Sequence, residues 1–226
     1  MPRLFIPGAT DDGPIDIPPT ELDKLRKVLR LSSGAMIGIL PNDGSVITAM
    51  VDGKQAVPVD RTNPQTEPKT KLTIAQALPK GDKLDEIVRA CSEIGVSHFV
   101  VFPSDRTVVK WDEKKTADRL SRLATIARES CELSFRTVLP TFESQRNLAD
   151  VLKRYPEAVV LSEIEGIAPK LSRDGKDAVL VVGPEGGWSG KELAAIGSRG
   201  ITLGPRVLRV DHAAAAAAAI LLLESA

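Results

Sequence analysis

The sequence predicts an α/β protein with a mostly parallel sheet, preceded by a small β-barrel or curled sheet with one helix. From residue 70 onward, short apolar runs alternate with helical patterns, as in parallel α/β sheets. Before residue 60, the apolar runs are separated only by tight turns. Between these regions, residues 61–68 are polar, contain two prolines and have no apolar period, which is typical of a linker. We therefore expect two domains, at residues 1–66 and 70–226.

The first domain is expected to contain one helix and several short strands. Thr20 is placed to cap a helix over residues 20–30, in which Leu22, Leu25 and Val28 share a face. Apolar runs follow at residues 35–40, 46–51 and 55–59, and the segments 42–44 and 52–53 between them contain Asp-Gly pairs that form tight turns.

The second domain is expected to alternate strands and helices to the end of the chain. Asp82 is placed to cap the first helix and Gly95 to end it, while Pro103 and Pro140 end short β-type runs. The strands are expected at residues 72–78, 99–102, 137–139, 158–161, 178–182 and 201–203. The helices are expected at residues 82–94, 113–131, 148–154, 190–198 and 212–224.

Composition excludes several classes of protein. The chain has 226 residues with 30 Lys and Arg against 30 Asp and Glu, so any nucleic-acid binding must come from local patches of charge. Cys91 and Cys131 form no CxxC pattern, and with two distant histidines they predict reduced thiols in a cytoplasmic protein and no metal site. We expect no signal peptide, and the final apolar run, residues 213–223, is too short to span a bilayer.

The first chemically informative segment is the loop Gly183-Pro-Glu-Gly-Gly-Trp-Ser189, which follows the apolar run 178–182. Ligands of parallel sheets bind beyond the carboxyl ends of the strands, and glycines let backbone approach a ligand closely. The loop matches neither the GxxxxGK[ST] nor the GxGxxG phosphate-binding pattern, and Glu185 would repel a pyrophosphate. A carboxylate is better tolerated by a ligand that carries a sulfonium and an ammonium. The helix after the loop is expected to begin near Ser189, with Glu192 three residues later at the spacing of a capping box. A turn that only reverses the chain is the alternative interpretation of the loop.

The second such segment is the loop Leu203-Gly-Pro-Arg-Val-Leu-Arg209, which leads into a helix that begins with seven alanines, residues 213–219. Arg206 and Arg209 lie in a loop shaped by glycine and proline, where arginine suits a phosphate or a developing anion. The alanines either only stabilise the helix or give it a slim surface that can approach another backbone or subunit closely.

Together, Val182-Gly-Pro-Glu-Gly-Gly-Trp-Ser189 and Leu203-Gly-Pro-Arg-Val-Leu-Arg209 resemble the signature of the 16S ribosomal RNA uridine N3-methyltransferases, the RsmE family of the SPOUT class. The resemblance extends over most of the chain, although its other matches are individually weak. The sequence departs from the family pattern at Asp211-His212, where a Glu-Thr pair is usual, and at Leu133, where glutamine is common. The weaker matches are residues 1–5, 25–31 with Gly34, 76–80 with Lys83, 93–96, Pro103 with Arg106, and Arg136 with Pro140.

The resemblance implies a function that spacing alone does not show. Members methylate N3 of uridine 1498 in 16S ribosomal RNA of the small subunit, using S-adenosylmethionine (SAM) as cofactor. The first domain would be a PUA-like RNA-binding β-barrel. The second would be a trefoil-knotted SPOUT domain that works as a homodimer and holds SAM in the knot. The substrate would be the RNA, within the 30S subunit, and neither membrane nor metal would be involved.

Candidate site residues follow from the two loops and the resemblance. Arg209, then Arg206, are expected to stabilise the uridine anion, with Asp211 as a third catalytic residue. Asp211, Glu185 and His212 all remain open as the general base. The expected cofactor contacts are Leu161, Gly183, Pro184, Glu185, Gly186, Gly187, Leu203, Gly204, Leu208, Val210 and Ala213.

Basic residues in both domains are candidates for RNA binding. Lys24, Lys27 and Arg30 recur at helical spacing, which is also typical of an ordinary solvated face. Arg106 and Arg136 either bind RNA or form ion pairs with Asp105 and Glu132. The expected RNA-binding residues are Arg3, Lys24, Arg26, Arg30, Arg106 and Arg136.

Other functions remain open at this point. A SPOUT methyltransferase that acts on another RNA position would show the same two loops. A non-catalytic RNA-binding protein would bind no SAM, and a nucleotide-dependent oxidoreductase would need a phosphate-binding glycine pattern that the chain lacks.

Overall fold

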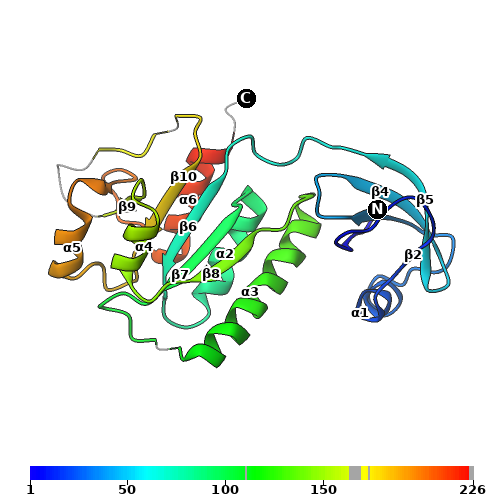
Figure 1. The fold of residues 1–226 in the computed structure, drawn as a ribbon, viewed down its shortest axis with the longest axis horizontal. Coiled ribbons are helices and arrows are strands. Elements are labelled where there is room, and N and C mark those ends of the chain that lie inside the picture. Colours follow the sequence, from blue (N-terminus) through cyan, green and yellow to red (C-terminus); the bar gives the residue numbers. More distant parts are fainter. Residues whose placement is uncertain (110, 163–168, 173, 224–226) are drawn as a thin grey trace. The chain divides into compact units, whose positions relative to one another are not determined.

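The computed structural model describes residues 1–109, 111–162, 169–172 and 174–223 (Figure 1). The chain forms two compact units. Unit 1 comprises Met1–Glu67 and Arg128–Leu139, and unit 2 comprises Pro68–Ala127 and Pro140–Ala226. Helix α3 (Glu113–Leu133) therefore contributes residues to both units. Among the residues described, no helix combines the length and apolar character that a bilayer span requires.

Unit 1 is built on a five-stranded sheet in the order β1-β3-β4-β5-β2. Strands β3, β4 and β5 form an antiparallel meander, β1 is parallel to β3, and β2 is antiparallel to β5. The expected turns at residues 42–44 and 52–53 join the meander. The strands are β1 (Arg3–Phe5), β2 (Ile15–Asp16), β3 (Met36–Leu40), β4 (Val46–Asp52) and β5 (Gln55–Thr62).

The helix of unit 1 differs from the expected one. It begins as α1 (Pro19–Asp23), continues as a π-helical turn, η1 (Lys24–Val28), and ends before Arg30, which has a positive φ of 54°. The expectation that Thr20 caps it is wrong, because Pro18 occupies the cap position, Pro19 starts the helix, and no side chain caps it. Lys24, Lys27 and Arg30 therefore do not form one regular helical stripe.

Unit 2 contains a six-stranded sheet in the order β11-β9-β10-β6-β7-β8, and every strand pair in it is parallel. The predicted parallel sheet is thus confirmed. The strands are β6 (Leu72–Ala77), β7 (His98–Phe102), β8 (Thr141–Ser144), β9 (Val159–Leu161), β10 (Ala178–Val182) and β11 (Gly200–Ile201). Besides α3, the helices are α2 (Lys83–Ile94), α4 (Leu148–Arg154), α5 (Gly190–Ile196), the 3₁₀ turn η2 (Gly197–Arg199) and α6 (Val210–Leu222).

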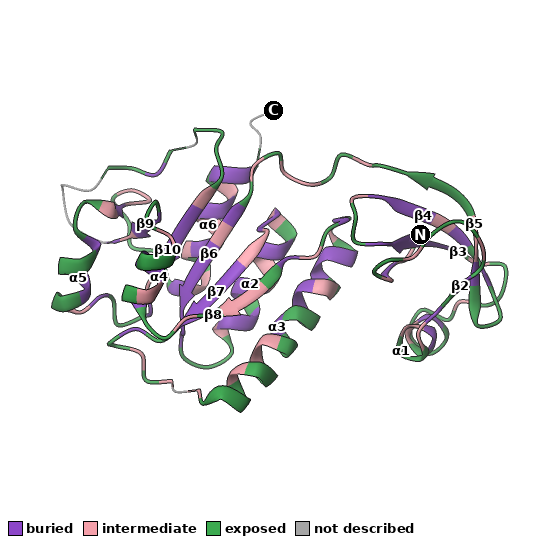
Figure 2. Ribbon diagram, in the orientation of Figure 1, coloured by how far each residue is buried: buried purple, intermediate pink, exposed green. Residues whose placement is uncertain are grey.

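The central strands of the unit 2 sheet are buried on both faces, whereas the edge strand β8 is half-buried or exposed (Figure 2). On β6, Leu72 and Ile74 join a core with α2, α6 and the first part of α3, while Ala75 and Ala77 join a second core with α4 and α5. Side chains alternate along a strand, so the two faces receive alternate residues. Near-continuous apolar strands are the expected result of this arrangement.

One expected strand is wrong. Residues 137–139 form no strand, because their backbone NH groups donate to side chains instead of to a neighbouring strand. The NH groups of Thr137 and Val138 donate to the Glu67 carboxylate at 2.8 and 3.2 Å, and the NH of Leu139 donates to the Asn42 side chain at 2.7 Å. The strand β8 begins after Pro140 instead. The expected cap of α2 is also partly wrong, since Asp82 stands at the cap position without a side-chain bond, while Gly95 ends the helix with φ 116°.

The alanine-rich helix α6 packs closely within unit 2. Ala214, Ala217 and Ala218 are fully buried, at the i, i+3 and i+4 positions of one face, and they join the core that contains α2 and β6. Because alanine side chains are small, the backbone of α6 can lie close to α2 and β6. This packing places the start of α6, and so the loop before it, next to the sheet.

We expect Ala218→Leu to lower the free energy of unfolding by about 1–3 kcal/mol, because the added atoms have no space between α6 and its neighbours. Urea denaturation followed by circular dichroism measures this loss. Ala194→Leu, at an exposed position of α5, is the matched control and should be nearly neutral. Equal stability of the two variants would contradict tight packing at Ala218.

Candidate functional site

A cleft of about 1240 Å³ lies in unit 2 at the carboxyl ends of β9, β10 and β11. Both loops singled out in the sequence line it, together with the first turn of α6. The structure therefore brings together all the residues expected to contact a cofactor. The lining residues are Lys83, Arg106, Leu161, Ser162, residues 182–188, Leu193, Ile201, residues 202–210 and Ala213.

The first loop is shaped by Trp188. A Cβ at Gly183 would lie 3.1 Å from the Trp188 indole, so a side chain there would make the indole shift by a few tenths of an ångström, whereas glycine leaves it in place. The indole donates a hydrogen bond to the carbonyl of Leu161 at 2.9 Å and stacks on Phe102, with centroids 6.5 Å apart. Trp188 thus fixes the first loop to β9 and β7, below the cleft.

The loop ends in the predicted capping box. The Ser189 hydroxyl accepts from the backbone NH of Glu192 at 3.1 Å, and the Glu192 carboxylate accepts from that of Ser189 at 2.8 Å. The same carboxylate accepts from the backbone NH of Asp105, and the Ser189 hydroxyl donates to the Asp105 carboxylate at 2.6 Å. Asp105 therefore holds the start of α5, and the expected pair between Arg106 and Asp105 is absent from the described contacts.

A buried glutamine on β6 supports the loop from below. Gln76 is 1% exposed, and its side-chain NH₂ donates to the carbonyls of Ala77, Gly183 and Val182 at 2.9, 3.3 and 3.5 Å. Its carbonyl oxygen is buried without a hydrogen-bond partner among the described residues. Gln76 is not among the site residues that the sequence predicts. The available signal was a lone amide within the apolar strand 72–78.

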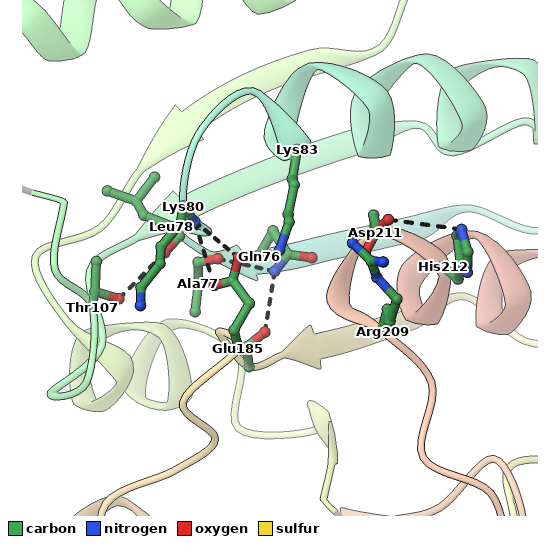
Figure 3. A network of polar contacts seen from close by, with 11 residues as sticks. Gln76, Ala77, Leu78, Lys80, Lys83, Thr107, Glu185, Arg209, Asp211 and His212 are labelled. Atoms are coloured by element: carbon green, nitrogen blue, oxygen red, sulfur yellow. Dashed lines mark hydrogen bonds and ion pairs between the residues drawn. The ribbon is translucent and has the colours of Figure 1, made fainter.

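Glu185 is held by a lysine and a backbone group (Figure 3). Its carboxylate accepts from Lys83 at 2.7 Å and from the backbone NH of Lys80 at 3.1 Å. Burial raises the pKa of Glu185, but hydrogen bonds from Lys83 and from the backbone outweigh this effect, so the pKa lies below its ordinary value. A carboxylate held in this ionised form is a weak proton acceptor, which disfavours Glu185 as the general base.

The second loop presents its arginines to solvent at the mouth of the cleft. Gly204 has φ 125°, and its backbone NH and carbonyl both bond to the Thr202 hydroxyl, which closes a tight turn. Arg209 stands at the cap position of α6 with its side chain 72% exposed, and its Nε lies 3.4 Å from Asp211. Arg206 is also exposed.

Asp211 links two basic side chains at the start of α6 (Figure 3). Besides Arg209, the His212 ring lies 3.7 Å from its carboxylate. The pKa of Asp211 is below its ordinary value, mainly because the carboxylate accepts from its own backbone NH, with further contributions from Arg209 and His212. Asp211 is therefore ionised at neutral pH and close to both candidate catalytic groups.

Arg106 and Arg136, two of the residues expected to bind RNA, have different environments. Arg106 lines the cleft and donates to the carbonyl of Gly186 at 2.8 Å. Arg136, by contrast, is 3% exposed and donates to Glu67 at 2.8 and 3.1 Å. Its expected role in binding RNA is wrong, because a buried guanidinium cannot reach a phosphate. The ion-pair alternative holds, with Glu67 in place of Glu132.

The other basic candidates belong to unit 1. Lys24 pairs with Glu132 at 2.7 Å, and Arg26 donates to the carbonyl of Gly53 at 2.6 Å. Arg3 lies over the Phe135 ring, 4.0 Å from its centroid. Arg30 is exposed.

Comparison with known proteins identifies the family. The model of an RNA methyltransferase domain matches residues 66–222, which is most of the chain. The chain belongs to this family of RNA methyltransferases. It is 30% identical, over 213 residues, to ribosomal RNA small subunit methyltransferase E of Bacillus subtilis, with 85% of this chain and 83% of the relative covered. It is 31% identical to the protein of that name from Synechocystis, with coverage of 99% and 78%.

Solved structures agree with this assignment. Ribosomal RNA small subunit methyltransferase E from Neisseria gonorrhoeae, bound to S-adenosyl methionine, superimposes with a TM-score of 0.87 at 29% identity, covering 97% of this chain and 96% of that one. A putative methyltransferase from Legionella pneumophila, in complex with SAM, gives 0.85 at 25% identity, with coverage of 96% and 95%. The SPOUT-type methyltransferase fold expected from the resemblance is thus confirmed for the parallel sheet.

The pair between Glu185 and Lys83 predicts a pH-dependent stability. Because the folded pKa of Glu185 is lowered, its contribution is fully present above the ordinary value of 4.5 and is lost as the pH falls through the folded pKa. Glu185→Gln should lower the free energy of unfolding by roughly 1 kcal/mol at neutral pH. This difference should shrink below about pH 4.5 in urea titrations. Glu157→Gln, at an exposed carboxylate, is the control. A constant difference down to acid pH would contradict the role of the charge.

Proposed function

We propose that this chain is a SAM-dependent methyltransferase that methylates N3 of uridine 1498 in 16S ribosomal RNA. The observation that supports this most directly is the cleft. In a chain of the RNA methyltransferase family, it joins the two glycine-bearing loops to an arginine pair at one end of a parallel sheet. The named relatives are methyltransferases of small-subunit ribosomal RNA.

The residues of the cleft fit SAM. Its inner wall is mostly backbone and apolar, with Leu161, Leu203 and Val210 beside the glycines of the first loop. Glycines at 183, 187 and 204 leave the backbone accessible to hydrogen bonds from an adenosine and an amino acid. Glu185, the ionised carboxylate on this wall, suits the positive charges of SAM better than a phosphate. We assign cofactor contacts to Leu161, residues 183–187, Leu203, Gly204, Leu208, Val210 and Ala213.

When bound, SAM supplies an electrophilic methyl group. The protein must then place uridine N3 in line with it and remove the N3 proton. Loss of that proton leaves a negative charge spread over N3, O2 and O4, and Arg209 with Arg206 would stabilise it. Their exposure at the mouth of the cleft leaves their guanidinium groups available to the RNA.

The proton from N3 is assigned to His212, because the pKa of Asp211, like that of Glu185, lies below its ordinary value. Glu185 is engaged by Lys83, whereas Asp211 lies within 4 Å of both Arg209 and His212. Asp211 therefore also orients Arg209 toward the substrate. The Asp-His sequence at these positions departs from the usual family pattern.

The finer features of the fold belong to the same proposal. Unit 1, a small curled sheet, would be the PUA-like RNA-binding barrel, and unit 2 the trefoil-knotted SPOUT domain. A homodimer is supported by exposed apolar side chains before, on and just after α6, at Val207, Ile220 and Leu223. The protein would act in the cytoplasm on RNA within the 30S subunit, with Arg3, Lys24, Arg26, Arg30 and Arg106 as RNA contacts.

Mapping the product tests the proposal. The chain should transfer labelled methyl groups from SAM to 30S subunits, and mass spectrometry should locate one methyl on N3 of uridine 1498. Subunits purified from a strain that lacks the endogenous enzyme are the substrate. Methylation at another nucleotide would refute the position, and no methylation of either 30S subunits or free 16S RNA would refute the activity.

Arg209→Ala should lower kcat about 10²- to 10³-fold, because one donor to the developing anion is lost. The Kd of SAM, measured by calorimetry, should change little, since the guanidinium is exposed at the mouth of the cleft. Arg146→Ala, at an exposed arginine of the same unit outside the cleft, is the matched control. Wild-type turnover in Arg209→Ala would remove Arg209 from catalysis.

A further inference from the structure

A second cavity lies in unit 2 and shares no lining residue with the cleft. Its volume is about 210 Å³, and it lies between the loop before α2 and the start of α3. Apolar side chains, two cations and two carboxylates line it together. The lining residues are Pro79, Gly81, Asp82, Leu84, Asp85, Val109, Trp111, Lys115, Arg119 and Leu123.

The side chains of this second cavity are arranged by kind. Trp111 is half-buried and packs on the same core as Leu84 and Leu123, so its ring forms a fixed apolar wall. Lys115 and Arg119 are one helical turn apart on α3, so they share a face. Neither forms an ion pair with any residue that the structure describes. Two cations beside an aromatic wall make a site for an anion that carries a flat ring.

The two carboxylates differ in their availability. Asp85 is buried and bonded to Arg122 at 2.5 Å, so its charge is already matched. Asp82 stands before α2, and its side chain accepts no hydrogen bond from the described part of the chain. Asp82 is therefore the carboxylate that is available to accept a hydrogen bond from a ligand in the second cavity.

The second cavity is linked to the cleft by the loop that contains Lys80. Pro79 and Gly81, the residues on either side of Lys80, line the second cavity. The backbone NH of Lys80 itself donates to Glu185, which lines the cleft. Lys83, one residue after Asp82, bonds to the same carboxylate. The loop thus has one side on each site.

We propose that the second cavity binds a nucleotide of the RNA substrate other than the methylated uridine. This rests on the proposed function. The base stacks on Trp111, an exocyclic amino group donates to Asp82, and the phosphate lies between Lys115 and Arg119. Adenine, cytosine and guanine carry such an amino group and uracil does not, so the cavity selects against uracil. Aromatic stacking combined with phosphate contacts is the usual way in which proteins hold unpaired nucleotides.

Fluorine NMR of protein labelled with 5-fluorotryptophan tests the site directly, because the chain has only two tryptophans, Trp111 and Trp188. The protein is saturated with SAM and titrated with AMP, GMP, CMP and UMP. AMP, GMP and CMP should shift the Trp111 signal, with UMP several-fold weaker, and the Trp188 signal should not move. Asp82→Asn should remove the preference over UMP. Lys115→Ala should weaken all four nucleotides, while the neighbouring Lys114→Ala, outside the cavity, should not.

Two results would overturn the site. One is a Trp111 signal that stays unmoved by all four nucleotides at about 10 mM, where even sites with a Kd of about 1 mM are largely occupied. The other is movement of both tryptophan signals together, which would place the nucleotide in the cleft.

A methylation assay connects the second cavity to the reaction. Trp111→Ala should raise the KM for 30S subunits roughly tenfold, as expected for loss of one stacked base, with the Kd of SAM unchanged. Trp111→Phe should restore most of the affinity, and thermal melting verifies that both variants fold. An unchanged KM in folded Trp111→Ala would refute a role in substrate binding. If the wild-type enzyme methylates no RNA but nucleotides still move the Trp111 signal, the proposed function fails and the nucleotide site stands.

Discussion

The candidate site depends on the close packing of α6 against the core that contains α2 and β6. Ala214, Ala217 and Ala218 make this approach through side chains of one carbon atom. The loop before α6 carries Gly204, Arg206 and Arg209, and it meets the Gly183 loop in one cleft only because α6 is anchored there. A longer side chain on that face would move the arginines away from the cofactor wall.

The first loop is held by a different set of contacts. Gln76 binds its carbonyls from below, Trp188 fills the space that a side chain at Gly183 would need, and Glu185 is tied to Lys83. Gln76 and Lys83 come from elements of unit 2 that are distant from the loop in sequence, whereas Trp188 belongs to the loop and ties it to Leu161. The loop is thus positioned before any ligand binds, which reduces the entropic cost of binding.

Local patterns predicted the elements of unit 2 better than its contacts. The limits of α4 and β10 follow from apolar period and turn residues alone, and the Ser189–Glu192 capping box from spacing. Residues 137–139 have a β-type composition, yet Glu67 and Asn42 take their NH donors, and no local pattern reveals such distant partners. The predicted role of Arg136 in RNA binding is wrong for the same reason, because its partner Glu67 lies far away in the sequence.

The arrangement of charge explains how a chain with no net charge can still recognise RNA. Several cations are already matched within their units, including Lys24 with Glu132, Lys83 with Glu185 and Arg136 with Glu67. Arg206 at the cleft, and Lys115 and Arg119 at the second cavity, form no ion pair among the described residues, and Arg209 keeps 72% of its side chain exposed beside Asp211. Both places therefore offer cations to the phosphates of the RNA. Since a uniformly basic surface would bind any RNA, this distribution favours selection by local geometry over affinity for nucleic acid in general.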